Sequence, residues 1–280
     1  MLSTEAALDD YSFEITARDL PALASTADRF PAGTRVNVTY LGTEDAADRL
    51  AAARAVADHG LTPVPHISAR RLLSEADLTS FLDGLAAQGT HRRVFAVGGD
   101  PAQPHGPYSE AAQVIASGHL AAAGVREVGI GGYPEGHPDI DDAALWDALT
   151  LKTRLIAEQG MNAAIATQFS FDTDAVLTWI RRVRDAGVDA PIRVGVPGPA
   201  GVKRLLGFAR RCGVASSATL ARKYGFSLGN LLGTAGPDAF IEDLAAGIDH
   251  GVHGEVRLHF FTFGGLDATA SWLERRPVAA

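Results

Sequence analysis

The chain has 280 residues, of which 46% are hydrophobic and 21% are charged. This balance is typical of a globular protein and excludes a mainly disordered chain. The length is slightly above the ~250 residues of one (β/α)8 barrel and too short for two enzyme domains of ordinary size. The formal net charge of −8 repels a phosphate backbone, so nucleic acid and anionic membranes are not expected partners.

The amino terminus and the cysteine content indicate a cytoplasmic protein. Residues 1–11 include Glu5, Asp9 and Asp10 and lack the basic start and apolar run of a secretory signal. Cys212 is the one cysteine of the chain, so no disulfide forms within it, which suits a reducing compartment. No apolar stretch approaches the ~20 residues that cross a bilayer, so we expect no membrane contact.

Short apolar runs alternate with longer amphipathic segments along the whole chain, as in parallel strands joined by helices. The predicted strands are Tyr11–Ile15, Arg35–Thr39, Thr62–Ile67, Arg93–Val97, Glu127–Gly131, Asn162–Thr167, Ile192–Val196 and Glu255–Phe260. Helical segments between them, such as Glu44–His59 and Glu75–Gln88, are each followed by a glycine of the kind that ends helices. Asp172 is expected to cap a further helix, and Gly198–His250 to hold two or three helices. The pattern predicts a single-domain (β/α)8 TIM-type barrel over residues 1–280.

Polar or turn-forming residues stand at the carboxyl end of almost every predicted strand, where barrel enzymes place their active sites. They are Glu14, Thr39, His66, Asp100, Tyr133, Glu135, His137, Gln168, Pro197, Gly198 and Thr262.

Three of these positions allow both a functional and a structural interpretation. Glu14 lies within an apolar strand, where a partly dry carboxyl group holds its proton and serves as a general acid; the alternative is an ion pair with an arginine. Asp100 follows Gly98 and Gly99, which permit a sharp turn or close approach to a ligand; the alternative is a loop cap. His66 is a candidate ligand of a phosphate or a metal, or else a satisfied structural histidine.

Two later segments combine side chains suited to binding. The loop Gly131–Pro138 carries an aromatic ring, a carboxyl group and an imidazole, and two prolines stiffen it, which favours ligand binding over an ordinary rigid turn. Gln168 offers an amide donor and acceptor for the edge of a heterocycle such as a pterin, with Phe169 and Phe171 beside it. The alternative is that both phenylalanines are core residues.

Other chemistries are disfavoured. Schiff-base catalysis needs a lysine at a strand end, whereas Lys152, Lys203 and Lys223 fall in helices or loops. No His-x-His or His-Glu-x-x-His spacing occurs, so no metal is expected. No Gly-x-Gly-x-x-Gly opens a helix after a strand, so a separate dinucleotide-binding domain is not indicated.

Several short motifs together resemble the methylenetetrahydrofolate reductase family, in the family's order over Ser12–Phe261. They are Ser12-Phe13-Glu14, Val38-Thr39-Tyr40, His66, Gly99-Asp100, Gly132-Tyr133-Pro134-Glu135-Gly136-His137-Pro138 and Thr167-Gln168-Phe169-Ser170-Phe171-Asp172. The Tyr-Pro-Glu-x-His-Pro loop and the Thr-Gln-Phe-x-Phe-Asp segment are the most specific. The resemblance implies that NADH or NADPH reduces FAD, which passes hydride to 5,10-methylenetetrahydrofolate to give 5-methyltetrahydrofolate, a step of one-carbon metabolism and methionine synthesis.

The resemblance also implies residue roles. Glu14 and Asp100 are the expected catalytic residues, with Glu14 as the general acid that helps to open the folate ring. Asp100, Gln168 and Phe171 are expected to contact the substrate. The expected cofactor-binding residues are Thr39, His66, Gly99, Asp100, Tyr133, His137, Asp147 and Arg154. We also expect a homo-oligomer.

The chain departs from the family pattern where a cofactor's phosphates would bind. Family members usually carry an arginine before the Gly-Asp pair, where this chain has Gly98. The helix after the Tyr-Pro-Glu loop usually supplies an amide and basic groups to the cofactor, and Thr150 and Thr153 stand at two of these places in this chain. Fewer cations mean fewer charge-assisted hydrogen bonds, so direct hydride transfer from NAD(P)H without flavin is an alternative. A non-reducing folate- or flavin-binding partner of a methyltransferase is another. A barrel lyase or metal hydrolase using His66, Asp100 and His137 is the third.

Overall fold

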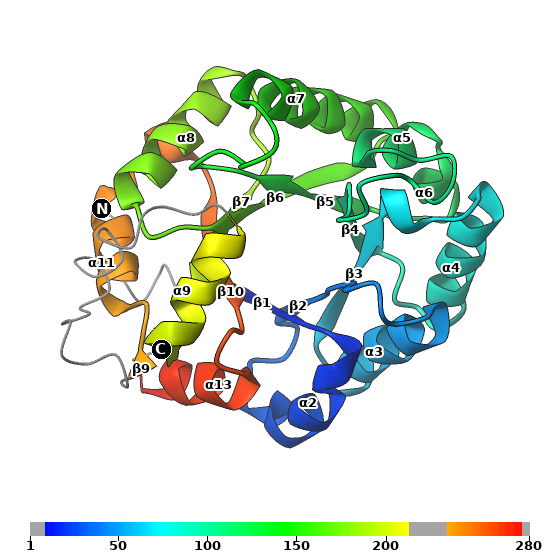
Figure 1. Cartoon of the computed structure of the whole chain (residues 1–280). Coiled ribbons are helices and arrows are strands. Elements are labelled where there is room, and N and C mark those ends of the chain that lie inside the picture. Colours follow the sequence, from blue (N-terminus) through cyan, green and yellow to red (C-terminus); the bar gives the residue numbers. More distant parts are fainter. Residues whose placement is uncertain (1–8, 213–233, 276–280) are drawn as a thin grey trace. The chain divides into compact units, whose positions relative to one another are not determined.

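The computed structural model describes residues 9–212 and 234–275. Eight parallel strands form a closed barrel with the hydrogen-bonded order β1-β10-β7-β6-β5-β4-β3-β2 (Figure 1). The strands are β1 (Ser12–Ile15), β2 (Arg35–Val38), β3 (Thr62–Ser68), β4 (Arg93–Val97), β5 (Glu127–Gly132), β6 (Asn162–Phe169), β7 (Ile192–Pro197) and β10 (Val256–Phe261). Each lies where the sequence predicts a strand, and the (β/α)8 barrel is therefore confirmed.

Helices separate most of the strands along the chain. The α-helices are α2 (Leu20–Thr26), α3 (Ala46–Asp58), α4 (Glu75–Ala87), α5 (Ala111–Ala116), α6 (His119–Ala122), α7 (Asp142–Glu158), α8 (Thr173–Asp185), α9 (Val202–Arg211), α11 (Asp238–Gly247), α12 (His250–His253) and α13 (Leu266–Glu274). Short 3-10 helices are η1 (Ala17–Asp19), η2 (Ala27–Arg29) and η3 (Ala69–Arg71). The described part of 198–250 contains α9, α11 and the start of α12, together with a small antiparallel pairing of β8 (Ala200–Gly201) with β9 (Thr234–Ala235) that the sequence did not predict.

The helix ends follow from local chemistry. Gly60 and Gly89 adopt φ of 72° and 76° after α3 and α4, a left-handed conformation that glycine tolerates without strain. The Asp172 side chain accepts hydrogen bonds from the amides of Asp174 and Ala175 at the start of α8, which confirms the predicted cap. These residues satisfy backbone groups that have no partner within the helix.

The chain comprises two compact units. Unit 1 contains residues 1–13, 132–146 and 166–280, and unit 2 contains residues 14–131 and 147–165. The single domain over residues 1–280 stays a prediction.

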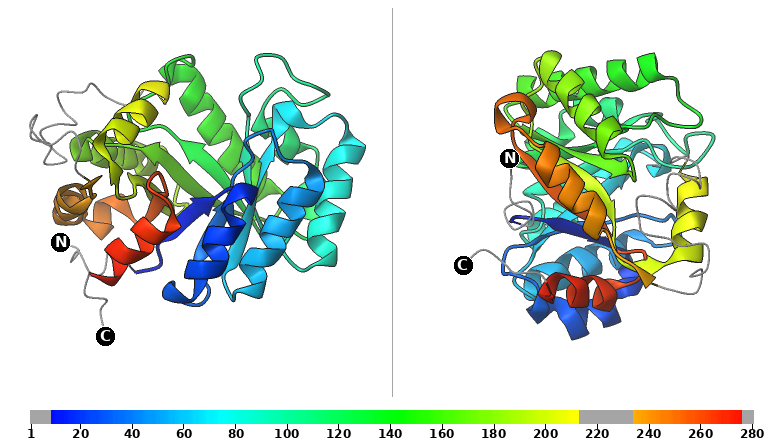
Figure 2. Two further views of the ribbon diagram at one scale, coloured as in Figure 1. Left: turned by 60° about the horizontal axis from the view of Figure 1, so that its bottom comes forward. Right: turned by 90° about the vertical axis from the view of Figure 1, so that its left-hand side faces the viewer.

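In unit 2, α2, α3 and α4 lie side by side (Figure 2, blue to cyan). Helix α3 packs on β3 through a buried face of small side chains, Ala52, Ala53 and Val56. Because these side chains are short, the helix axis can approach the strands closely. In unit 1, α11 lies against α8 (Figure 2), and α8 buries Val176, Ile180 and Val183 on one face at helical spacing.

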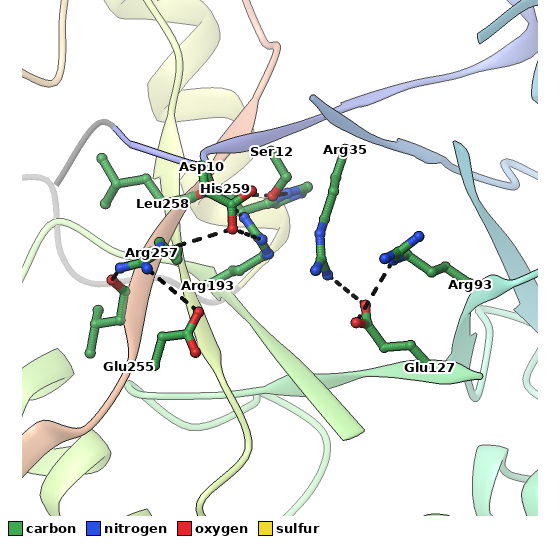
Figure 3. Close-up of polar contacts among 11 residues, drawn as sticks. Asp10, Ser12, Arg35, Arg93, Glu127, Arg193, Glu255, Arg257, Leu258 and His259 are labelled. Carbon is green, nitrogen blue, oxygen red and sulfur yellow. Dashed lines mark hydrogen bonds and ion pairs between the residues drawn. The ribbon is translucent and has the colours of Figure 1, made fainter. Parts of the chain in front are cut away.

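Charged residues at the beginnings of the strands form ion pairs within each unit (Figure 3). In unit 2, Glu127 binds Arg35 at 2.5 Å and lies 3.8 Å from Arg93. In unit 1, Asp10 binds Arg193 at 2.7 Å; Arg257 lies 3.8 Å from Asp10 and 3.7 Å from Glu255. Such residues stand at the amino ends of the strands, where polar groups of barrels usually serve stability.

Candidate active site

Glu14 lies in β1 near the carboxyl end of the strand. Phe13 and Ile15 on either side are fully buried, whereas Glu14 is half-buried. Side chains alternate between the two faces of a strand, so the Glu14 carboxyl group points away from the face that Phe13 and Ile15 share. The position combines partial burial with access, as a general acid requires.

Thr39 and His66 are held by protein partners in unit 2. The Thr39 hydroxyl donates a 2.6 Å hydrogen bond to the carbonyl of Ile15. His66 is buried, its Nε2 lies 3.2 Å from the Asn37 amide nitrogen, and its ring stacks on Phe95 at 4.7 Å. These contacts favour the structural interpretation of His66, and the cofactor contacts of both residues stay predictions.

The turn after β4 requires glycine and presents Asp100 to solvent. Gly99 has φ of +96°, and a side chain there would lie 2.0 Å from the Ser68 hydroxyl. The Asp100 side chain is 84% exposed, and its carboxylate lies 3.3 Å from the Arg71 guanidinium. Sequence reasoning missed Arg71; the signal was the Arg70-Arg71 pair that follows β3 directly.

The Tyr133–His137 loop of unit 1 is stiffened by its own contacts. The Gly136 amide donates to the Tyr133 carbonyl at 3.1 Å, and the Tyr133 and His137 rings meet edge to face at 5.4 Å. Glu135 accepts a 2.5 Å hydrogen bond from the Ser170 hydroxyl, a contact that the sequence did not predict. Burial, with a smaller contribution from the charge of Cys212, raises the pKa of the Tyr133 phenol, so Tyr133 stays a hydrogen-bond donor at neutral pH.

Gln168 is half-buried near the end of β6, also in unit 1, and its Oε1 accepts a hydrogen bond from the Phe169 amide at 3.1 Å. The Gln168 side-chain nitrogen is a donor suited to a heterocycle edge. Phe169 and Phe171 meet edge to face at 5.8 Å, and Phe171 has no exposed surface. This burial favours the core interpretation of Phe171, and its contact with substrate stays a prediction.

The part of α7 that belongs to unit 2 presents Asp147 and Arg154 to solvent. Arg154 lies 3.7 Å from Glu158, one helical turn along. Thr150 donates to the Asp147 carbonyl at 3.1 Å and Thr153 to the Leu149 carbonyl at 3.1 Å, so both hydroxyls bond within the helix. The cofactor contacts of Asp147 and Arg154 stay predictions.

Lys152, on the same helix, is a half-buried lysine. Burial lowers its pKa from 10.5 to about 8, while the charge of Glu110 opposes part of this shift. Below about pH 8 the lysine is charged in both the native and the unfolded chain, so the full penalty of burying the charge is present. As the pH rises from about 8 to about 10.5, the native chain loses the proton before the unfolded chain does, and the free energy of unfolding rises.

We therefore expect Lys152→Met to raise the free energy of unfolding by about 2 kcal/mol near neutral pH, with a gain that shrinks toward about pH 10. Urea denaturation across this pH range measures the effect. Lys203→Met is the matched control, because Lys203 is exposed on α9 and its replacement should change stability little at any pH. A gain at Lys152 that does not depend on pH would contradict the explanation.

Two of the three lysines, Lys152 and Lys203, lie in helices, which confirms that part of the expectation; Lys223 lies outside the described residues. No group of three or more His, Cys, Asp or Glu side chains suited to a metal ion occurs in residues 9–212 and 234–275. No helix in this part of the chain is long and apolar enough to span a membrane.

Comparison with known proteins identifies the family. A sequence model of the family described as methylenetetrahydrofolate reductase matches residues 8–276. The chain belongs to this family. Among curated members, methylenetetrahydrofolate reductase 1 of Schizosaccharomyces pombe is 35% identical over 69 residues, 25% of this chain. Methylenetetrahydrofolate reductase 2 of Saccharomyces cerevisiae is 34% identical over 85 residues, 30% of this chain.

The matched segments span 11% and 13% of those two yeast proteins. Among solved structures, an intracellular xylanase of Thermoanaerobacterium saccharolyticum gives a TM-score of 0.47 at 12% identity, covering 93% of this chain and 88% of the xylanase. A likeness of this size adds nothing to the functional assignment, which depends on the family match.

Proposed function

We propose that this chain reduces 5,10-methylenetetrahydrofolate to 5-methyltetrahydrofolate, with NADH or NADPH as the source of hydride. The observation that carries the proposal is a half-buried carboxyl group, Glu14, near the carboxyl end of the first strand of a barrel whose sequence matches the reductase family over residues 8–276. Barrel enzymes use groups at this end of the strands for chemistry.

The proposed chemistry needs one proton and one hydride. Glu14 donates its proton to N10 of the folate, the bond between N10 and the methylene carbon breaks, and the methylene carbon becomes the electron-poor end of an N5 iminium. Hydride then adds to this carbon and forms the methyl group. A placed general acid contributes ~10²–10⁴ in rate, because a neutral amine leaves more readily than its anion.

Binding of the folate pterin is assigned to Gln168 and Asp100. The Gln168 amide nitrogen donates a hydrogen bond to a ring acceptor, and the exposed Asp100 carboxylate accepts from a ring N–H.

FAD is the proposed carrier of the hydride between the nicotinamide and the folate, and when bound it supplies two-electron redox chemistry. The turn after β4 is compatible with its binding, because a side chain added at Gly98 would meet no atom within 4 Å. Thr39, His66, Gly99, Tyr133 and His137 are the residues proposed to hold it.

Direct hydride transfer from the nicotinamide is the second candidate. It is favoured by Gly98, which brings no cation to the end of β4, and by Thr150 and Thr153, whose hydroxyls bond within α7. At both places the chain offers fewer charge-assisted hydrogen bonds to an FAD diphosphate.

The absorbance spectrum of the purified protein distinguishes the two routes. We expect a yellow protein whose flavin band is bleached by NADH and restored by methylenetetrahydrofolate. A colourless protein that oxidises NADH only when the folate is present would select direct transfer. A protein that binds the folate without any NAD(P)H oxidation would overturn the reductase and favour a binding partner of a methyltransferase.

A further inference from the structure

Three arginines of unit 2, Arg49 of α3 and Arg70 and Arg71 of η3, contact residues at or just after the carboxyl ends of β3 and β4. Arg49 donates to the His66 carbonyl at 2.5 Å and is sandwiched between Tyr40 and Phe81, with its guanidinium carbon 4.1 and 3.9 Å from the ring centroids. Arg70 donates to the carbonyls of Ser109 and Pro101 at 2.7 and 3.2 Å. These two guanidinium groups are engaged in holding loops.

Arg71 is held in a different way. Its guanidinium lies against the backbone of Gly42, so close that a Cβ atom added to this glycine would lie 1.8 Å from Nη1 of Arg71. The guanidinium carbon of Arg71 lies 5.4 Å from the centroid of the Tyr40 ring. Its side chain is 17% exposed, and its buried Nε finds no hydrogen-bond acceptor among the described residues. Arginine has five N–H donors, so packing fixes this cation in place while much of its donor capacity is unused.

The ion pair between Arg71 and Asp100 is weakly held. A single guanidinium nitrogen lies 3.3 Å from the carboxylate, and the Asp100 side chain is 84% exposed. Exposed pairs with one long contact contribute little to stability. Separating the Asp100 carboxylate from Arg71 therefore costs little.

A second polar group lies at the end of β3, three residues before Arg71 in the sequence. Ser68, the last residue of β3, is 4% exposed, and its hydroxyl has no hydrogen-bond partner among the described residues. It lies against the backbone of Gly99, which follows β4, and the register pairs Ser68 with Val97. A buried hydroxyl that forms no hydrogen bond is costly.

We propose that Arg71, with Ser68, binds the diphosphate of a dinucleotide, and that this diphosphate replaces Asp100 as the anion on the guanidinium. A guanidinium fork held against Gly42 and a hydroxyl donor held against Gly99 together suit phosphate oxygens. The exchange releases the Asp100 carboxylate for the ring of the bound folate or cofactor. The identity of the ligand as a dinucleotide rests on the proposed function, whereas the anion site rests on the contacts of unit 2.

Isothermal titration of ADP, NADH and FAD into the purified full chain tests the proposal. Arg71→Gln is expected to weaken each ligand whose diphosphate it binds by about 10-fold or more, while nicotinamide mononucleotide and riboflavin, which lack a diphosphate, change less than about twofold. The separate NADH and FAD titrations show which dinucleotide supplies the diphosphate. The matched control is Arg54→Gln, since Arg54 is an exposed arginine of α3 that pairs with Asp58.

Asp100→Asn provides an independent test, because this substitution is expected to raise the affinity for ADP where Arg71→Gln lowers it. Removing the competing carboxylate is expected to tighten ADP about two- to fivefold, and the gain should vanish in the Arg71→Gln, Asp100→Asn double variant. Arg71→Lys keeps the charge without the planar fork and should give an intermediate affinity, which covers the case in which Arg71→Gln folds poorly.

Three results would each overturn the anion site. The Arg71→Gln variant could bind ADP as tightly as the parent chain, or the parent chain could fail to bind ADP. The variant could also lose affinity only for folates, whose glutamate carboxylates would then be the anions that Arg71 binds. These results are separable from the proposed reaction. If the parent chain reduces the folate and the Arg71→Gln variant binds ADP normally, only the role of Arg71 is refuted. A chain that binds ADP through Arg71 without reducing the folate refutes only the reductase.

Discussion

Glu14→Gln is expected to lower the rate of methylenetetrahydrofolate reduction by about 100-fold or more. Glutamine keeps the size and the hydrogen-bonding shape of the side chain but has no proton to give, so N10 of the folate must leave without acid assistance. Oxidation of NADH by the protein with an artificial electron acceptor needs no proton transfer to N10 and is expected to stay within about twofold of the parent rate. Stopped-flow measurement of the two half-reactions separates these outcomes.

The matched control is Glu75→Gln, which removes an exposed carboxylate from α4 in the same unit and should leave both half-reactions unchanged. An equal loss in the two half-reactions of Glu14→Gln would assign Glu14 to binding or folding and remove it as the acid. Folate affinity measured by titration completes the test, because a glutamine variant that binds the folate normally and does not reduce it locates the defect in the chemical step.

The sequence predicted the barrel because its strands carry a local signal. Arg93–Val97 is a short apolar run of β-branched and aromatic residues, and the structure has β4 at the same residues. The ends of α3, α4 and α8 were predicted for the same reason, since a glycine with positive φ or a capping aspartate acts on backbone groups within a few residues. Eight repeats of one local pattern were sufficient to specify the architecture.

The contacts of the candidate site could not be predicted in this way, because they join residues far apart along the chain. The hydrogen bond between Glu135 and Ser170 spans 35 residues, and the pairing of Arg71 with Asp100 spans 29. The burial of Phe171 depends on Phe169 and on packing that no spacing reveals. A strand-end position identifies a candidate, and only tertiary packing decides which of its donors and acceptors remain available.

Gly195→Ala is expected to destabilise the protein by about 3 kcal/mol or more. Gly195 lies in β7 against β6, within unit 1, and an added methyl group would lie 2.4 Å from the Thr167 carbonyl oxygen and 2.7 Å from the Phe169 amide nitrogen. These are backbone atoms, which cannot rotate away as a side-chain end can. The two strands must therefore separate, which also weakens the 2.8 Å hydrogen bond from the Gly195 amide to the Thr167 hydroxyl.

Because Gln168 lies between the two clashing residues, the same separation is expected to displace the side chain proposed to bind the pterin. Thermal and urea denaturation measure the loss of stability, and folate titration at low temperature, where the variant is folded, measures the loss of binding. Gly207→Ala is the matched control. Gly207 is in the interior of α9, where an added methyl group meets no atom within 4 Å, so alanine should stabilise that helix by roughly 0.5–1 kcal/mol. A Gly195→Ala variant as stable as the parent would show that β6 and β7 are not packed as closely as the structure places them.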